Sequence, residues 1–286
     1  MNHMKKYISI LIIALIALAP VFSFAQSVEE KSAANYSKIA PKLKEMAEKG
    51  ASTSELIITA ALMRVNEPYV AGTLETIPEK LIVNIGETDC ILFVESCLAM
   101  ALNAKNGATD YESLCKIVQG LRYRDGIVNG YSSRLHYTSE WIMQGEKNGI
   151  FTEITKKLSG GNLSGQKFSY MSTHTDSYKQ LKDSPAEVAT IREAELKLNE
   201  YDYYLIKKED IPNVLKDLKD GDILGLNTSV KGLDIAHVGY IYHVDGEVHF
   251  IHASYGAKKV VVETKTLVEY ANNSKSCDGI RIIRVK

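Results

Sequence analysis

The sequence has no block of basic residues, no common zinc-binding motif and, after residue 25, no long apolar run. Its 34 Lys and Arg are matched by 35 Asp and Glu, so the chain offers no stripe of positive charge to a nucleic acid. It contains neither His-Glu-x-x-His nor Cys-x-x-Cys, spacings that commonly hold zinc. No later stretch approaches the ~20 apolar residues that a membrane-spanning helix requires. We therefore expect no nucleic-acid partner, no cofactor and no membrane-embedded domain.

The first 25 residues have the pattern of a secretory signal peptide. Lys5 and Lys6 precede an apolar run over residues 8–22, and the pattern Ser-Phe-Ala ends at Ala25. Cleavage there removes two lysines and no acidic residue, leaving 32 basic against 35 acidic side chains, a formal charge of −3. The residue directly after the predicted cleavage site is Gln26 and not a cysteine that could carry a lipid anchor. We expect a periplasmic protein, with secretion as the alternative, and no stable membrane insertion after cleavage.

The spacing of apolar residues predicts helices first and strands afterwards. Residues 26–65 form a helical lead-in of two predicted helices, the second opened by a capping box of Ser52 and Glu55. Residues 90–105 have helical spacing again, with Asp89 at the N-cap position. The last third contains the β-rich runs "DGDILGLNT", "AHVGYIYHV", "EVHFIHAS", "KKVVVET" and "GIRIIRV". This order predicts an α+β fold with N-terminal helices packed on an antiparallel β-sheet.

Four cysteines in an exported protein could form two disulfides; they are Cys90, Cys97, Cys115 and Cys277. Cys90 and Cys97 lie seven residues apart on one predicted helix, roughly 10 Å along its axis, which is too far for a bond between them. If Cys90 is a working thiol, at most one disulfide is possible among the other three. The sequence leaves that pairing open.

Cys90 stands at the start of a predicted helix. Cysteine is commonly a small buried hydrophobe. At a helix N-terminus, however, a thiol meets free backbone N–H groups and the positive end of the helix dipole, which lower its pKa. An imidazole beside it can take the proton, and a second polar group can orient that imidazole. Cys90 is therefore a candidate nucleophile if the fold delivers a histidine to it.

Asp245-Gly246, between two β-rich runs, predicts a two-residue hairpin that supplies such a histidine. Counting back from this turn places Gly239 opposite His252. Because side chains alternate along a strand, His237 and His252 then share a face as diagonal neighbours, ~7 to 8 Å apart at the backbone. Gly239 leaves room for one ring to lean toward the other. The other two histidines of the hairpin fall too far along the strand or on the opposite face.

The motifs "DC", "HVGYIY" and "FIHAS", in this order, resemble those of papain-like peptidases of the NlpC type. By this resemblance, Cys90 is the nucleophile, His237 is the base and His252 is the orienting residue. Tyr69, in "PYVAG", matches a tyrosine that lies near the nucleophile in those enzymes and helps to stabilise the oxyanion.

The segments "PYVAGTLE", "TDCILFVESCLAMAL", "YSSRLHYTSEWI" and "DGDILGLNTSVKGLDIAHVG" extend the resemblance over almost the whole mature chain. Together they resemble the N-acetylmuramoyl-L-alanine amidase-like branch of that superfamily. The resemblance implies a papain-like catalytic domain over residues 66–286. It also implies that the partners are peptidoglycan fragments, cleaved between the lactyl group of muramic acid and L-alanine.

Four further residues are candidates for substrate contact. "SRLHYTSEW" places Arg134, His136 and Tyr137 beside the single tryptophan, a set that suits a ligand bearing carboxylates and sugars. The same cluster could instead cap and pack a helix. Asp89 could contact substrate or could serve only as an N-cap.

Three alternatives remain open at this point. One is a γ-D-glutamyl endopeptidase that cuts inside the stem peptide, and another is a catalytically silent muropeptide-binding protein. The third is zinc chemistry, for which His237 with His252 is one ligand short of a catalytic site. The presence of all three catalytic residue types argues against a silent protein.

Overall fold

The structure is a computed structural model that describes residues 27–286, so the predicted signal peptide lies outside the described residues. Its α-helices are α1 (Val28–Glu48), α2 (Thr53–Met63), α3 (Cys90–Lys105), α4 (Tyr111–Arg122), α5 (Thr138–Lys147), α6 (Thr155–Leu158), α7 (Tyr170–Thr173), α8 (Pro185–Leu198), α9 (Ile211–Val214) and α10 (Leu267–Asn273). Its strands are β1 (Phe151–Glu153), β2 (Ile206–Lys207), β3 (Ile223–Thr228), β4 (Ile235–Val244), β5 (Glu247–Ser254), β6 (Lys259–Val262) and β7 (Cys277–Val285).

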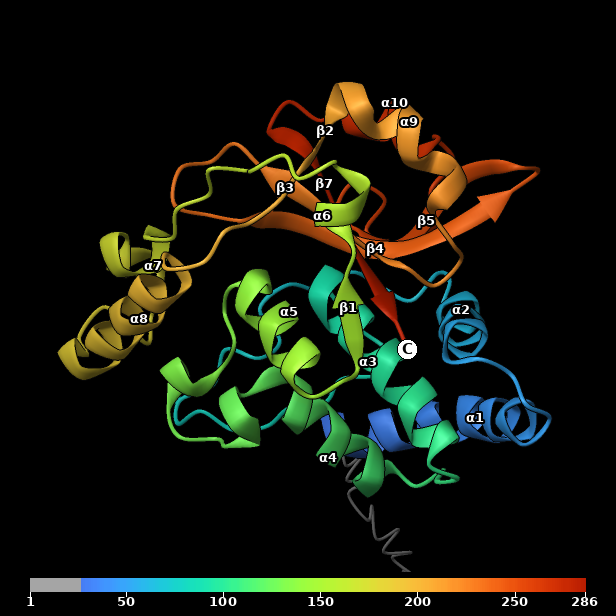
Figure 1. Cartoon of the computed structure of the whole chain (residues 1–286). Helices are drawn as coiled ribbons and strands as arrows, with labels where there is room; N and C mark the ends of the chain where they lie inside the picture. The colour runs from blue at the N-terminus through green and yellow to red at the C-terminus, as the bar shows by residue number, and fades with distance from the viewer. Residues whose placement is uncertain (1–26) are drawn as a thin grey trace, which may run out of the picture.

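The strands form one antiparallel sheet in the order β1-β7-β3-β4-β5-β6, and β2 pairs with β7 beside this path. Figure 1 shows α1, α3, α4 and α5 on one side of the sheet and α9 and α10 on the other. The predicted α+β class, with the N-terminal helices packed on an antiparallel sheet, is confirmed.

The two faces of the sheet belong to two hydrophobic cores. Val238, Tyr240 and Ile251 pack with α1 to α4 in the larger core. Ile241 and Phe250 pack with α9 and α10 in the second core. This division follows from the alternation of side chains along each strand, and it explains why β4 and β5 are apolar at consecutive positions.

Helix α3 is the central helix of the larger core. It contacts α1, α2, α4 and β4, and apolar residues surround its axis instead of forming one stripe, as expected for a buried helix. Asp89 caps it as predicted, because its Oδ1 accepts a hydrogen bond from the Leu92 N–H at 3.0 Å. Cys90 is therefore held in the first turn of a buried helix that packs on three other helices and on the sheet.

The predicted hairpin is present with the predicted register. Asp245 and Gly246 have φ values of 51° and 86°, the positive values that a type I′ turn requires, and Val244 pairs with Glu247. One feature of β4 was not predicted. Its pairing with β3 shifts beside Leu226, which leaves one extra residue in β4 immediately before His237 and forms a β-bulge.

The sequence pattern did not predict several of the shorter helices and strands. Strands β1 and β2, of three and two residues, are too short to show an alternation. Helices α7 and α8 pack with Phe168 and Tyr203 in a third apolar cluster, in a region for which the sequence analysis predicts no element.

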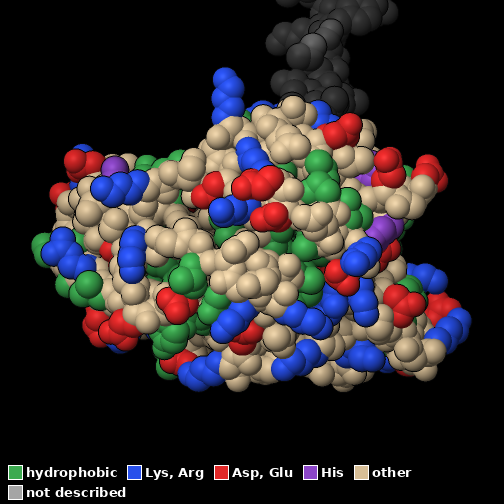
Figure 2. Space-filling view, turned by 45° about the horizontal axis from the view of Figure 1, so that its top comes forward, with side chains coloured by type: hydrophobic (Ala, Val, Ile, Leu, Met, Phe, Trp, Pro, Cys, Tyr) green, Lys and Arg blue, Asp and Glu red, His purple; other side chains and the backbone are tan. Residues whose placement is uncertain are grey.

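The surface carries both signs of charge. Acidic and basic side chains are interspersed over the face shown in Figure 2. Among the helices of the described residues, none combines the length and the apolar character needed to cross a membrane.

All four cysteines are free thiols in the structure. Cys97 is fully buried, and its sulfur lies 3.5 Å from Nη1 of the buried Arg64. Arg64 in turn forms an ion pair with Glu67 at 2.6 Å. Cys97 therefore belongs to the packing of α3 against α2.

Cys97→Ala should lower the free energy of unfolding by about 1–2 kcal/mol, because the thiol is lost from a close-packed site. Chemical denaturation measures this change. Cys115→Ala is the matched control, since Cys115 is only half-buried and its loss should be smaller. Equal losses at the two positions would contradict the packing role of Cys97.

Candidate active site

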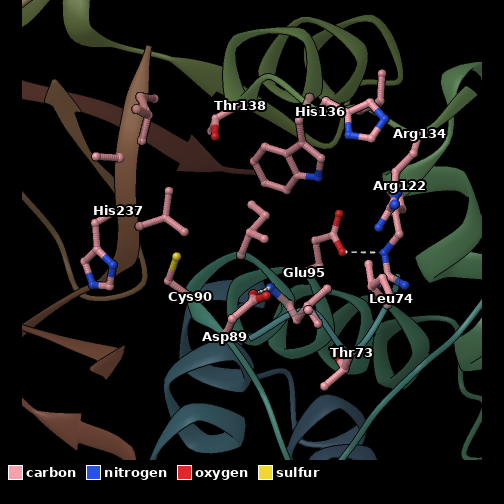
Figure 3. A pocket seen from close by; sticks show the side chains of 18 of the residues that line it. Thr73, Leu74, Asp89, Cys90, Glu95, Arg122, Arg134, His136, Thr138 and His237 are labelled. Carbon is pink, nitrogen blue, oxygen red and sulfur yellow. Dashed lines mark hydrogen bonds and ion pairs between the residues drawn. The ribbon is translucent and has the colours of Figure 1, made fainter. Parts of the chain in front are cut away.

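Cys90 and His237 line the same pocket, which has a volume of about 290 Å³. Its walls come from residues 72–75, the first turns of α3, residues 134–136, Thr138 and the start of β4. Figure 3 shows Cys90 and His237 at one end of the pocket, with Arg122 and Arg134 at the other. The fold thus joins two parts of the chain that are almost 150 residues apart in the sequence.

His237 and His252 form the predicted pair. Nε2 of His237 lies 2.6 Å from Nδ1 of His252, within hydrogen-bond distance, and the rings meet edge to face. Gly239 makes this approach possible, because a Cβ there would lie 2.8 Å from the Ile251 carbonyl oxygen and 3.1 Å from the His252 Cβ. Any larger residue at position 239 would push the strands or the ring aside.

Burial sets the protonation states of Cys90, His237 and His252. It raises the pKa of the Cys90 thiol to about 12, and the Asp89 carboxylate adds to this shift. It lowers the pKa of His237 to about 3, with His252 adding to the effect, and that of His252 to about 4. Thiol and imidazoles are therefore neutral at pH 7.

The helix-start effect that the sequence predicts is present but is outweighed. The backbone N–H groups of Ile91, Cys90 and Val238 act on the sulfur and lower its pKa, yet burial is the larger influence. An arrangement of neutral thiol and neutral imidazole favours proton transfer during attack over a thiolate formed beforehand.

The far end of the pocket holds two buried arginines, each paired with carboxylates. Arg122 Nε lies 2.8 Å from Glu95 Oε2. Arg134 lies 3.2 Å from Glu75 and 3.4 Å from Glu79. Arg122 and Glu95 were missed by the sequence reasoning, although an acidic residue inside the apolar helix "CILFVESCLAMAL" was a usable signal.

Two more pocket residues, Thr73 and Trp141, were not predicted. Among the described residues, the Thr73 hydroxyl and the Trp141 indole N–H are buried without a hydrogen-bond partner, and both residues line the pocket. An unpaired buried donor costs about 1–3 kcal/mol. Both groups are therefore available to hydrogen-bond a ligand.

Three of the residues predicted to contact substrate line the pocket, and two do not. Asp89, Arg134 and His136 line the pocket. Nε2 of His136 lies 2.8 Å from the carbonyl oxygen of Tyr131 and donates to it. Asp89 serves as the cap of α3 and as a pocket wall at once.

Tyr69 and Tyr137 do not line the pocket. Tyr137 is buried in the third apolar cluster and its hydroxyl donates to Glu195 at 2.7 Å, a packing role. Tyr69 pairs with Thr88, next to the start of α3. Burial raises the pKa of Tyr69 to about 12, and the nearby Cys90 contributes to this shift.

Metal ligation finds no support in the geometry of residues 27–286. Within them, no group of three or more His, Cys, Asp or Glu side chains is arranged to hold a metal ion. His252 turns its second ring nitrogen to a carboxylate instead, at 3.3 Å from Glu263.

Comparison with known proteins identifies relatives that cover most of the chain. A family model described as N-acetylmuramoyl-L-alanine amidase-like matches residues 59–280. The crystal structure of an N-acetylmuramoyl-L-alanine amidase from Bacteroides uniformis ATCC 8492 has 36% sequence identity and a TM-score of 0.78, covering 82% of this chain and 100% of that one.

Two further structures are similar. A Bacteroides fragilis protein, whose description proposes a xylanase, has 39% identity and a TM-score of 0.75, covering 79% of this chain and 99% of that one. A Legionella pneumophila protein, at 21% identity and a TM-score of 0.65 over 90% of this chain and 95% of that one, shares the fold. No curated protein matches the chain.

The neutral state of His252 should make stability depend on pH. Its pKa is lowered to about 4 in the fold, whereas an unfolded histidine titrates near ~6.5, so the unfolded chain takes up the proton first as pH falls. His252 should thereby lower the free energy of unfolding by about 2 kcal/mol at pH 5 relative to pH 7.

The His252→Asn variant should lose less stability between these pH values, by about that amount. Urea unfolding of both proteins at pH 7 and pH 5 measures the difference. His174→Asn, at an exposed position, is the matched control. Identical pH dependence in the wild type and His252→Asn would contradict a buried, neutral His252.

Proposed function

Because the chain belongs to the N-acetylmuramoyl-L-alanine amidase-like family, we propose that it is an exported cysteine amidase acting on muropeptides. The bond cleaved is the amide between the lactyl group of N-acetylmuramic acid and L-alanine. The observation that carries this proposal is the site itself. Cys90 opens α3 in the same pocket as His237, and His237 is hydrogen-bonded to His252 at 2.6 Å.

The proposed reaction uses the ring nitrogen of His237 that His252 leaves free. His252 engages Nε2, so Nδ1 is the atom that takes the thiol proton as the Cys90 sulfur attacks the lactyl carbonyl carbon. The C–N bond then breaks, and His237 returns the proton to the departing amine of L-alanine. Water, activated by His237, hydrolyses the thioester and frees Cys90.

Two donors are suited to the oxyanion that forms in this attack. The Cys90 backbone N–H lies in the first turn of α3, where helix amides have no partner within the helix. Tyr69 keeps its hydroxyl proton at neutral pH, because burial raises its pKa to about 12, and a protonated hydroxyl can donate. Preorganised donors of this kind stabilise tetrahedral intermediates.

The polar pocket supports recognition of the substrate. Thr73 and Trp141 offer buried donors without partners in residues 27–286, which suits the amide and hydroxyl oxygens of an N-acetylated sugar. Arg134 is 7% exposed in its side chain and already neutralised by glutamates. The pocket is therefore rich in donors and nearly balanced in charge.

One observation favours the second candidate, a γ-D-glutamyl stem-peptide endopeptidase. Asp89 lines the pocket directly beside the nucleophile, where a carboxylate can hold the free amine of a peptide. Burial raises the pKa of Asp89, which makes this carboxylate a weaker partner for an amine. An amidase acting on the sugar-linked end meets no free amine at this point.

Cys90→Ala should lower the rate of muropeptide hydrolysis by about 10³-fold or more, since no nucleophile remains, while the fold stays intact. Mass spectrometry of defined muropeptides resolves the products, and it separates cleavage at the lactyl amide from cleavage within the stem peptide or at a glycosidic bond. Cys97→Ala is the control and should retain most activity per folded molecule. Hydrolysis by Cys90→Ala at the wild-type rate would refute the nucleophile assignment.

Alkylation and chelation separate thiol from zinc chemistry. Iodoacetamide should abolish hydrolysis by modifying Cys90, because His237 can take the thiol proton as the sulfur attacks the reagent, and a chelator should leave the rate unchanged. Peptide mapping identifies the alkylated cysteine. Loss of activity in chelator, restored by added zinc, would show that a metal takes part in the reaction.

A further inference from the structure

The second ring nitrogen of His252 is held by a carboxylate that no sequence motif indicates. Nε2 of His252 lies 3.3 Å from Oε2 of Glu263, directly after β6. The His252 side chain is 0% exposed and that of Glu263 is 12% exposed. Among the described residues, His237 and Glu263 are the hydrogen-bond partners of the His252 ring.

Three neighbouring strands place these side chains on one face of the sheet. His237 on β4 is a diagonal neighbour of His252 on β5, because the residue opposite His252 is Gly239. Glu263 is a diagonal neighbour on the other side, because Val261 of β6 pairs with His252 and Glu263 follows two residues later. The three polar groups therefore form a row across β4, β5 and the end of β6.

We propose that Glu263 is a positioning residue that fixes the tautomers of both histidines and so leaves His237 able to accept the proton of Cys90. The inference rests on the proposed cysteine chemistry for its role in catalysis. The hydrogen-bond row itself stands on geometry alone.

The tautomers follow from counting donors and acceptors. A neutral imidazole has one N–H and one bare nitrogen, whereas an ionised carboxylate can only accept. Glu263 therefore requires the proton of His252 to be on Nε2, which leaves Nδ1 of His252 bare. That nitrogen must accept from Nε2–H of His237, so Nδ1 of His237 is bare and can take the thiol proton.

Without the carboxylate, the opposite arrangement has the same number of hydrogen bonds between the rings. His252 could donate from Nδ1 to a bare Nε2 of His237. The proton of His237 would then be on Nδ1, and no base would face Cys90. Glu263 is the group in the row that distinguishes these two arrangements.

The surroundings hold Glu263 and His252 in place. The backbone N–H of Lys265 donates to Oε1 of Glu263 at 3.1 Å, which leaves Oε2 for His252. The His252 ring lies between Phe250, at 4.5 Å between ring centroids, and Tyr270, at 5.7 Å. When His237 takes the thiol proton, the Glu263 charge also favours the imidazolium, since it acts to raise the pKa of His237.

The experiment compares Glu263→Ala and Glu263→Gln with wild type. Glu263→Ala should lower kcat by roughly 10²-fold, whereas Glu263→Gln, whose amide oxygen can still accept from His252, should lose only about 10-fold. KM should change little, because Glu263 is not among the residues that line the pocket. Glu247→Gln, at an exposed position on β5, is the matched control and should behave as wild type.

A measurement without substrate tests the tautomers directly. Long-range ¹H–¹⁵N spectra of the histidine rings should show Nε2–H on His237 in wild type and Glu263→Gln, and a shift toward Nδ1–H in Glu263→Ala. An unchanged His237 tautomer in Glu263→Ala would overturn the proposal, as would a loss confined to KM or to the free energy of unfolding.

The two readouts keep this inference distinct from the proposed function. If wild-type protein leaves muropeptides intact while the His237 tautomer still depends on Glu263, the proposed substrate is wrong and the hydrogen-bond row stands. If muropeptides are hydrolysed equally well by wild type and Glu263→Ala, the function stands and the role of Glu263 is refuted.

Discussion

The packing of α3 against β4 is the constraint on which the site depends. Tyr240 of β4 is fully buried, and its hydroxyl donates to the Val94 carbonyl of α3 at 2.6 Å. This bond joins helix and strand four residues from Cys90 and three residues from His237. Because α3 is surrounded by apolar neighbours, it cannot shift without opening the larger core. The proposed nucleophile and its proposed base are thus held by two elements that pack against each other in the larger core.

The same burial that fixes the site also governs its chemistry. Burial of His252 and partial burial of Cys90 and His237 favour the neutral forms of these groups, and the free N–H groups at the start of α3 are not enough to reverse this for Cys90. Reaction then depends on a base with its lone pair aimed at the thiol. A row of hydrogen bonds across three strands is a rigid way to secure that direction, because strand register leaves each side chain little freedom.

At the end of the pocket away from Cys90, the charges of the buried side chains are already paired. Two buried arginines there are each balanced by glutamates, so that charge is compensated before any ligand arrives. The Trp141 and Thr73 donors, in contrast, have no partner within residues 27–286. Leaving such donors unpaired lowers stability, and a polar ligand that meets them recovers this free energy on binding. The pocket is therefore built to select by hydrogen bonds more than by net charge.

Local patterns in the sequence were sufficient to predict much of the scaffold. The cap at Asp89, the helix that begins at Cys90, the Asp-Gly turn and the pairing of His237 with His252 all depend on residues close in the chain, where helical and strand periods act directly. Long-range contacts were not accessible in this way. The bulge before His237, the Arg122–Glu95 pair, the burial of Tyr137 and the contact of Glu263 with His252 each depend on how distant segments pack, which no local period specifies. The sequence determined which groups share an element or a hairpin, and the tertiary structure decided which of them meet, because only packing of the core sets the distance between elements.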